Sequence, residues 1–499
     1  MVKQQFNLDT PLLHLRDNDG VTNWTIRDAV EGLQIFGGIG SGKSSGSGKT
    51  IALKYLSAGF GGLVLCCKAD EAATWIRYAK QAGRSDDIVV IEQNGNHSFN
   101  WLEYESAHRV GGVSITQNVV QVLKTVLRAR DEKNGGKSDD QFWEAALDLL
   151  ITRLIELCQL AYGKISVRQL FDLVKALPKK GEGGKEEANT MVFTEAFNLA
   201  QSKVNDLTKE FMKGLSEKEK AALKDAKTYE AVIIEAIPEA ATLKYVFEFF
   251  SAEYRNLSEK TRSIIEFSYT SFLAGLVQEP IYSHFCRYRS TVTPEDCLDG
   301  KIVIVNFPVK HYNKVGQDIQ VMVKYIFQRA WERRNVTQNG RFCFLWADES
   351  QLFIHEYDAE WQATARSSRI ATVYLSQNLA NYNANMGGAK YQHRVTAFLG
   401  TLGTKIFHCN ADHQTNVYAS ELIGQHWVIK QQRSKSFGQG FSMGTSEAPE
   451  LQQIVRPEEF STLLKGGPEN DFFVEAYMHL QGKTFHTGAS HRKIVFNQK

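Results

Sequence analysis

Long apolar runs are missing from this 499-residue sequence, in which eighteen apolar residues nowhere follow one another. A helix that spans a bilayer needs about 20 such residues. Residues 1–20 also lack the apolar core of a secretory signal. Membrane insertion and secretion are therefore disfavoured, and a soluble protein of the cytoplasm is expected.

Net charge is nearly absent as well, because 58 Lys and Arg residues stand against 56 Asp and Glu residues. A strongly basic chain would indicate a nucleic-acid partner, and this balance gives no such indication. Any contact with DNA must come from a local patch. Lys430, Arg433 and Lys435 are the nearest cluster, and a solvated loop explains them equally well.

Cysteine is scarce, and no two cysteines form the C-x-x-C pair of a metal site. The seven cysteines lie mostly in apolar stretches, so we expect buried free thiols in a reducing compartment. They are Cys66, Cys67, Cys158, Cys286, Cys297, Cys343 and Cys409. A hydrophobic content of 43% excludes wholesale disorder, and the length predicts at least two domains.

The most informative motif is the glycine-rich run from Gly37 to Ser44, which directly follows the apolar residues 33–36. It fits G-x-x-x-x-G-K-[ST], the loop that holds phosphates between a strand and a helix. Its backbone N–H groups and the helix dipole favour phosphate oxygens. Lys43 is predicted to neutralise the β- and γ-phosphates of ATP, and Ser44 to bind Mg²⁺. The predicted nucleotide contacts are Gly37, Gly38, Ile39, Gly40, Ser41, Gly42, Lys43, Ser44 and Ser45.

A second G-K-[ST] follows at Gly48, Lys49 and Thr50. Lys43 stands where this second motif would need its first glycine, and no strand precedes it. We therefore predict that Lys43, not Lys49, is the phosphate lysine. Gly46 and Gly48 either allow a nucleotide or a neighbouring subunit to approach, or show that the helix begins late.

The alternation of apolar strand-like runs and helical periods predicts an α/β fold with a parallel-rich sheet. Strands are expected at 33–36, 63–67, 88–91, 301–307, 342–346, 371–374, 405–407 and 472–477. Between them, apolar residues recur at helical spacing for nearly two hundred positions. We predict a discontinuous ATPase domain at 1–110 and 296–499, with an inserted all-α domain at 111–295.

Within the helical region, Ser138–Gln141 and Ser216–Glu219 are capping boxes that predict helix starts. Residues 178–185 are rich in lysine and glycine and predict an exposed loop. Near the other end of the chain, the Gly/Ser-rich residues 434–446 are also interpreted as a surface loop.

Two further strand ends carry polar side chains suited to ATP hydrolysis. Asp348 and Glu349 follow the apolar run 342–347, where Asp348 would hold Mg²⁺ and Glu349 would activate the attacking water as general base. Gln377 ends the next strand and can sense the γ-phosphate at the carboxyl edge of the sheet. Arg366 or Arg369, just before that strand, could reach a nucleotide in an adjacent subunit.

Taken together, these motifs resemble the type IV secretion coupling proteins of the TraG/TraD class, which are FtsK/HerA-like P-loop ATPases. The resemblance rests on residues 37–44, 99–102, 142–144, 299–304, 347–349, 376–378, 402–407, 415–424 and 456–459. Two features depart from it. The transmembrane helices that commonly begin such proteins are missing, and the usual acidic-Pro-Lys becomes Cys66-Cys67-Lys68.

The resemblance implies a RecA-like P-loop NTPase with an inserted all-α domain, working as a hexameric ring. It also favours Arg366 as the arginine that reaches the neighbouring subunit's nucleotide, because the family carries a similar arginine at this place. It implies ATP and Mg²⁺ as cofactors and DNA, often single-stranded or protein-linked, as cargo. Secretion-channel or relaxosome-type proteins would be partners, at the inner membrane. Two alternatives stay open: a HerA-like motor of a defence or DNA-processing complex, and a nucleotide-gated receptor for a secreted protein.

Overall fold

A computed structural model describes residues 6–16, 20–107, 115–133, 141–177, 190–223, 225–386, 391–437 and 441–499. The chain divides into two compact units. Unit 1 comprises residues 1–89, 294–310 and 328–499, and unit 2 comprises residues 90–293 and 311–327. The domain boundaries that we predicted at 110/111 and 295/296 differ from this division into units and stay a prediction.

A nine-stranded sheet organises unit 1, in the order β13-β12-β9-β3-β8-β7-β4-β6-β5. The strands from β9 to β6 run parallel, and β12 and β13 are antiparallel additions at one end. Their bounds are β3 Leu33–Phe36, β4 Gly61–Leu65, β5 Ile88–Ile91, β6 Ile302–Val305, β7 Cys343–Ala347, β8 Ile370–Ser376, β9 Thr404–His408, β12 Phe473–Leu480 and β13 His491–Asn497. The α/β fold with a parallel-rich sheet is therefore confirmed.

The inner strands are buried along their whole length and are mostly apolar, because helices cover both faces of a parallel sheet. Every residue of β3, β4, β6, β7 and β8 is buried. Helix α3 (Glu71–Gln81) buries Ala72, Trp75 and Ala79, which share one helical face. The Trp75 ring stacks on Phe344 of β7 at a centroid distance of 5.2 Å. These contacts fix the strands whose carboxyl ends carry the polar motifs.

Further helices and a short hairpin complete unit 1. Strands β1 (Pro11–Arg16) and β2 (Val21–Thr25) pair with each other, and sequence reasoning did not predict them. The helices are α1 Ile26–Val30, α2 Lys49–Ser57, α14 Pro294–Leu298, α16 Tyr357–Ala365, α17 Leu379–Met386, α18 Tyr391–Gly400 and α19 His413–Ile423. Helix α15 (Val309–Glu332) has residues in both units and contains a kink at Asn313.

Unit 2 is built of helices apart from the end of β5 at its margin. They are α4 Trp101–Ala107, α5 Ile115–Lys133, α6 Gln141–Tyr162, α7 Val167–Lys175, α8 Thr190–Gly214, α9 Glu217–Ala222, α10 Ala226–Ala236, α11 Pro238–Glu248, α12 Tyr254–Asn256 and α13 Glu259–Leu276. The capping box at Ser216 is confirmed, with the Glu219 N–H donating to the Ser216 hydroxyl. The box at Ser138 and the loop at 178–185 lie outside the described residues.

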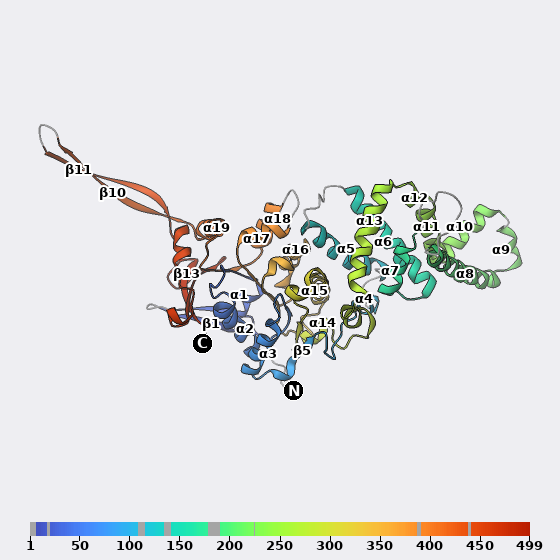
Figure 1. Ribbon diagram of the computed structural model, residues 1–499, viewed down its shortest axis with the longest axis horizontal. Coiled ribbons are helices and arrows are strands. Elements are labelled where there is room, and N and C mark those ends of the chain that lie inside the picture. The colour runs from blue at the N-terminus through green and yellow to red at the C-terminus, as the bar shows by residue number, and fades with distance from the viewer. Residues whose placement is uncertain are drawn as a thin grey trace. The chain divides into compact units, whose positions relative to one another are not determined.

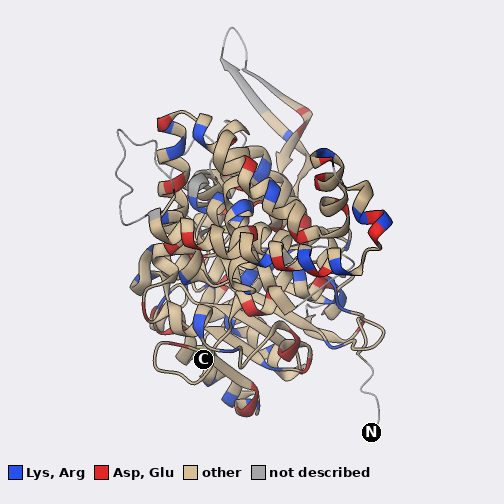
Figure 2. Ribbon diagram, turned by 90° about the vertical axis from the view of Figure 1, so that its right-hand side faces the viewer, with Lys and Arg blue, Asp and Glu red and all other residues tan. Residues whose placement is uncertain are grey.

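Charges on unit 2 are balanced locally. Lys209 pairs with Asp206, Lys213 with Glu210, at i,i+3 spacing on α8. Lys220 pairs with Glu217 on α9 in the same way. Figure 2 shows Lys and Arg interspersed with Asp and Glu along the ribbon. The near-zero net charge therefore reflects mixing within elements.

The described residues of the Gly/Ser-rich stretch, 434–437 and 441–446, lie in strands and not in a loop, so that prediction was wrong for them. Strands β10 (Gln425–Phe437) and β11 (Phe441–Gln453) pair antiparallel in unbroken register and project from unit 1 (Figure 1). Small and polar residues can occupy a two-stranded ribbon because neither face needs to meet a core. Lys430 pairs with Glu450 across this ribbon, at 2.9 Å.

Among the helices in the described ranges, none is both long and apolar enough to cross a membrane.

Candidate nucleotide site

The glycine-rich loop leaves β3 at the carboxyl edge of the sheet. Strand β3 lies between β8 and β9, so the loop emerges flanked by the ends of both neighbours. The N–H groups of Gly37 and Gly38 donate to the carbonyls of Ser376 and Cys409, which anchors the start of the loop. Gly40 and Gly42 have φ of 69° and 79°, a left-handed conformation that favours glycine.

The segment after the loop is wound as a π-helix over Ser44–Gly48 before α2 begins. Such turns are rare and often lie at functional sites. A Cβ on Gly48 would lie 2.9 Å from the Lys43 carbonyl, and one on Gly46 would lie 3.3 Å from Val474. Glycine at these two positions therefore leaves room for the Lys43 carbonyl and for β12. Neither interpretation of Gly46 and Gly48 from the sequence predicted this close packing. The regular helix does begin late, at Lys49.

Lys43 and Lys49 have different surroundings. The Lys43 ammonium is buried and lies 3.7 Å from Glu349 Oε1. Lys49 instead donates to the backbone carbonyl of Gln498, at 2.9 Å. Gln498 also donates from Nε2 to the Ser45 hydroxyl, at 2.6 Å. Lys49 and Ser45 are thus both hydrogen-bonded to Gln498, whereas Lys43 lies next to the carboxylate of Glu349.

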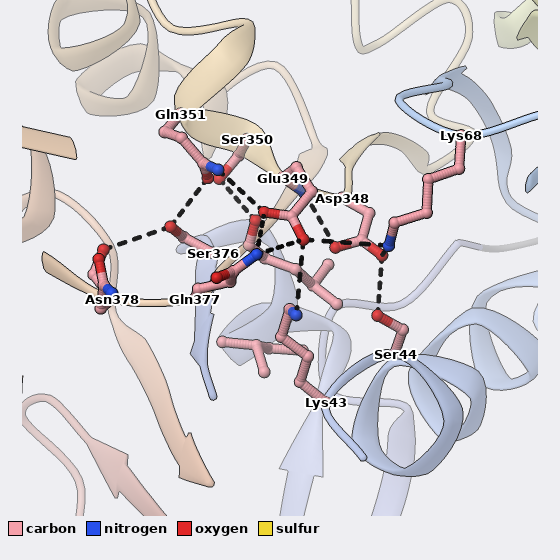
Figure 3. A network of polar contacts seen from close by, with 12 residues as sticks. Lys43, Ser44, Lys68, Asp348, Glu349, Ser350, Gln351, Ser376, Gln377 and Asn378 are labelled. Carbon is pink, nitrogen blue, oxygen red and sulfur yellow. Dashed lines mark hydrogen bonds and ion pairs between the residues drawn. The ribbon is translucent and has the colours of Figure 1, made fainter. Parts of the chain in front are cut away.

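Asp348 and Glu349 follow β7 and meet the loop directly (Figure 3). The Ser44 hydroxyl donates to Asp348 Oδ2 at 2.8 Å, and the Glu349 N–H donates to Asp348 Oδ1 at 2.9 Å. Lys68, which follows β4, lies 3.8 Å from Asp348 Oδ2 and 3.9 Å from Glu349 Oε1. Two ammonium groups and two carboxylates therefore share one cluster at the carboxyl ends of three strands.

Glu349 is held in place by amides. Gln351 Nε2 donates to Glu349 Oε2 at 2.9 Å, and Gln377 Nε2 lies 3.3 Å from Glu349 Oε1. Burial opposes ionisation of Glu349, but the bond from Gln351 and the charge of Lys43 outweigh it and lower its pKa. Glu349 also has a positive φ of 50°, a conformation with a cost of about 1–3 kcal/mol for a residue of this kind. A buried, anionic and fixed carboxylate is the result.

Gln377 lies where the strand order puts it. Strand β8 lies between the loop strand β3 and β7, so its carboxyl end lies between the ends of those two strands. The Gln377 carbonyl accepts from Asn410 Nδ2 at 2.8 Å, which ties it to the end of β9. The predicted set Lys43, Ser44, Asp348, Glu349 and Gln377 is thus brought together, while their catalytic roles stay predictions.

Sequence reasoning missed several supporting residues of the loop and its edge. His408, at the end of β9, contacts the Ser47 hydroxyl through Nε2 at 2.7 Å and the Glu475 carbonyl through Nδ1 at 3.2 Å. A carbonyl only accepts, so Nδ1 donates and neutral His408 accepts from Ser47. Burial lowers the pKa of His408 to about 3 and keeps it neutral. The rule that polar residues at strand ends meet could have found His408 and Asn410.

Both arginines lie apart from the cluster. Arg366 ends α16, is 57% exposed at its side chain, and pairs with Glu31 at 3.1 Å. Arg369 has a φ of 55°, donates to the Gly340 carbonyl at 3.0 Å, and lies over the Phe342 ring. Packing therefore holds Arg369, whereas Arg366 is available to another molecule. Ile39, at the loop tip, is 84% exposed.

The oxygen donors at the loop fit a magnesium ion. Ser44 Oγ and Asp348 Oδ2 lie within 2.8 Å of each other and could both bind it. Mg²⁺ prefers oxygen ligands and is usually held by one or two carboxylates together with phosphates and water. Among the described residues, no larger group of His, Cys, Asp and Glu is placed to hold a metal without such help. The chemistry of this pair therefore fits a magnesium ion whose remaining ligands a nucleotide and water would supply.

This combination of fold and site defines a class. A parallel sheet with a phosphate loop after β3, a carboxylate pair after β7 and a glutamine after the intervening β8 is a RecA-like P-loop NTPase fold. Residues 345–465, which include Asp348, Glu349 and Gln377, match a family model described as the TraM recognition site of TraD and TraG. Among curated proteins, none matches the sequence.

Solved structures extend the comparison to almost the whole chain. The plasmid coupling protein TrwB in complex with ADP and Mg²⁺ is 12% identical, with a TM-score of 0.55 over 99% of this chain and 90% of that chain. TrwB with the non-hydrolysable GTP analogue GDPNP is 13% identical, with a TM-score of 0.53 over 95% and 87%. Identity this low shows the fold alone. The resemblance to the TraG/TraD class is confirmed, in sequence over 345–465 and in fold over nearly the whole chain.

Proposed function

We propose that this chain is an ATP-hydrolysing motor that moves or recruits DNA, in the manner of conjugative coupling proteins. The observation that carries the proposal is the pairing of Lys43 with Glu349 and of Ser44 with Asp348 at one sheet edge. The TrwB structures, which have this fold and are in complex with ADP and Mg²⁺ or with a GTP analogue, support a nucleotide as the ligand.

The roles follow from the geometry. Lys43 and the loop N–H groups would bind the phosphates, and Ser44 and Asp348 would hold Mg²⁺, which neutralises phosphate charge when bound. Glu349 would accept the proton of the attacking water. Its pKa is lowered partly by Lys43. When phosphate draws Lys43 away, that contribution weakens and the carboxylate becomes a stronger base. Gln377, hydrogen-bonded to Glu349, would sense the γ-phosphate.

Arg366 belongs to the proposal as a residue that acts across a subunit interface. Its side chain is 57% exposed, and an exposed ion pair such as the one with Glu31 contributes little free energy, so another subunit could engage the guanidinium. Such a finger stabilises charge on the transferred phosphoryl group. A hexameric ring, DNA cargo and a cytoplasmic site attached peripherally to the inner membrane complete the proposal, with secretion-channel or relaxosome-type partners.

A second candidate is a nucleotide-gated receptor for a protein substrate. The description of the matched family model as a TraM recognition site favours it, because that description concerns protein binding. A HerA-like motor of a defence or DNA-processing complex would share the same chemistry.

The ATPase rate with and without DNA distinguishes a DNA motor of either kind from a receptor for a protein substrate. The motor hypothesis predicts that single- or double-stranded DNA stimulates hydrolysis by the wild-type protein, and that Lys43→Ala abolishes both basal and stimulated rates. A receptor should respond to its protein substrate and ignore DNA. Stimulation that persists in Lys43→Ala would show that the activity comes from elsewhere.

A further inference from the structure

Lys68 is the charged residue of the cluster that the predicted reaction does not use. It follows β4, and its ammonium lies 3.8 Å from Asp348 and 3.9 Å from Glu349 (Figure 3). These distances are ion-pair contacts and are longer than a hydrogen bond. Its side chain is 45% exposed, whereas Lys43 is 10% exposed at its side chain. Lys68 is therefore near both carboxylates without being fixed to either.

The surroundings favour the charged form of Lys68. Burial opposes its charge, but the carboxylates Asp348, Glu71 and Glu349 outweigh this and raise its pKa. Glu71, three residues further on, accepts from the Cys67 N–H at 2.7 Å. The carboxylates with which Lys68 forms ion pairs are the two that follow β7.

Lys43 and Lys68 approach those carboxylates from different elements, the phosphate loop and the end of β4 (Figure 3). The Lys43 and Lys68 ammonium groups lie 3.7 Å and 3.9 Å from the same oxygen, Glu349 Oε1. Under the proposed function, the attacking water and the γ-phosphate would meet beside Glu349, and Ser44 and Asp348 would hold Mg²⁺. A bound metal beside Asp348 would repel the Lys68 ammonium from that carboxylate, and its flexible stem would let it turn toward new negative charge.

We propose that Lys68 is a second phosphate lysine, which contacts the γ-phosphate and so makes the site prefer ATP to ADP. The inference rests on the proposed ATPase function and assigns a specificity-determining residue to it. Lys43 would contact the β-phosphate, which both nucleotides have, in addition to the γ-phosphate, whereas Lys68 would gain its contact only when the γ-phosphate is present. Removing its ammonium should therefore affect ATP binding and leave ADP binding almost unchanged.

The test is the affinity of the full-length protein for ADP and for the slowly hydrolysed analogue ATPγS, both with Mg²⁺. Lys68→Met should weaken ATPγS by roughly 10- to 100-fold, the worth of one hydrogen bond to a charged group, and change ADP by less than about threefold. Lys68→Arg keeps the charge and should restore most of the difference. Lys80→Met, on the exposed face of α3, removes the same charge away from the site and should leave both affinities unchanged.

Equal weakening of ATPγS and ADP by Lys68→Met would overturn the inference, because Lys68 would then only position the carboxylates. Unchanged affinity for both nucleotides would overturn it too. Either result, in a wild-type protein that binds ATPγS and hydrolyses ATP, leaves the proposed function intact. A wild-type protein that binds neither nucleotide would instead contradict the proposed function and remove the basis for Lys68. A melting curve for each variant identifies loss of folding, and Lys68→Arg then carries the comparison.

Discussion

At the scale of single residues, the site consists of two ammonium groups and two carboxylates that lie slightly farther apart than a hydrogen bond. Lys43 and Lys68 lie 3.7–3.9 Å from the carboxylates, so each ammonium can move to phosphate without breaking a short hydrogen bond. The carboxylates themselves are fixed by Ser44, Gln351 and neighbouring backbone. Mobile cations around fixed anions are suited to a site that binds and releases a polyanion.

The two lysines of the duplicated motif should separate cleanly by mutation. Lys43→Ala is expected to abolish ATP binding, because Lys43 faces the carboxylate pair. Lys49→Ala should leave ATP affinity within several-fold, because Lys49 donates to the Gln498 carbonyl. Fluorescent-nucleotide titration of both variants checks this. If Lys49→Ala abolished binding and Lys43→Ala did not, the loop assignment would be wrong.

His408 should contribute a pH dependence to stability. Its pKa is lowered by burial from 6.5 to about 3, so between these values the unfolded chain binds more protons at this position. Stability from His408 is therefore complete above about pH 6.5 and is lost as pH falls toward 3. His408→Gln keeps an acceptor for Ser47 and should flatten the stability profile between pH 6.5 and 4, by up to about 1.4 kcal/mol per pH unit.

Denaturant unfolding at several pH values measures this slope. His479 has a pKa lowered to about 4 by burial and stays in the variant, so part of the slope should persist. An identical slope in wild type and His408→Gln would show that His408 is not held neutral in the folded protein.

At the scale of elements, the sheet edge does most of the positioning. The loop follows β3, the carboxylates follow β7, the glutamine follows β8 and His408 ends β9. Continuous apolar runs made these strands predictable, and parallel order then brought their ends together. The π-turn over Ser44–Gly48 was not predictable, because it depends on how closely Val474, more than four hundred residues later, approaches Gly46.

Other elements escaped prediction for related reasons. The hairpin at 425–453 lacks the strict apolar alternation of a half-buried strand, and glycine and serine in its middle favour a loop on local grounds. Pairing between its two strands decides the outcome instead. Likewise, the separate surroundings of Arg366 and Arg369 depend on Glu31 and Gly340, which are distant in sequence.

The outer part of this hairpin should be dispensable for folding of unit 1. Replacing residues 430–448 by Asn-Gly joins the paired Ile429 and Pro449 through a two-residue turn. The described side chains in that stretch, those of residues 430–432 and 445–448, are exposed, so their removal costs no core contact. The melting temperature should change by less than about 2 °C, as expected for loss of surface residues alone. A drop of about 5 °C or more would show that the outer hairpin packs on the body.

At the scale of the whole molecule, the candidate nucleotide site takes its residues from unit 1, and the largely helical unit 2 is built from a different part of the sequence. Site residues come from positions 37 to 410, so the insertion leaves the sheet edge intact. The exposed Arg366 is the proposed link from one copy to the next. Assembly would then complete a site that one copy holds only in part.

Subunit mixing tests that link. Arg366→Ala and Lys43→Ala proteins should each be inactive alone and regain some ATPase activity when co-assembled, because mixed interfaces pair an intact site with an intact arginine. A finger in trans is worth about 10³–10⁵ in rate, so even few such interfaces are measurable. Mixing Glu349→Gln with Lys43→Ala is the matched control and should stay inactive. Variants that co-assemble and remain inactive in every ratio would place Arg366 outside the interface.

The central claim is that Glu349 activates water for ATP hydrolysis, and the most direct test is turnover by Glu349→Gln. The substitution keeps the size and most contacts of the side chain but removes the charge that accepts a proton. ATP affinity should persist, while the Mg²⁺-dependent rate of hydrolysis should fall by roughly 10²- to 10⁴-fold, the usual contribution of a general base. Hydrolysis near the wild-type rate by Glu349→Gln would contradict the assignment.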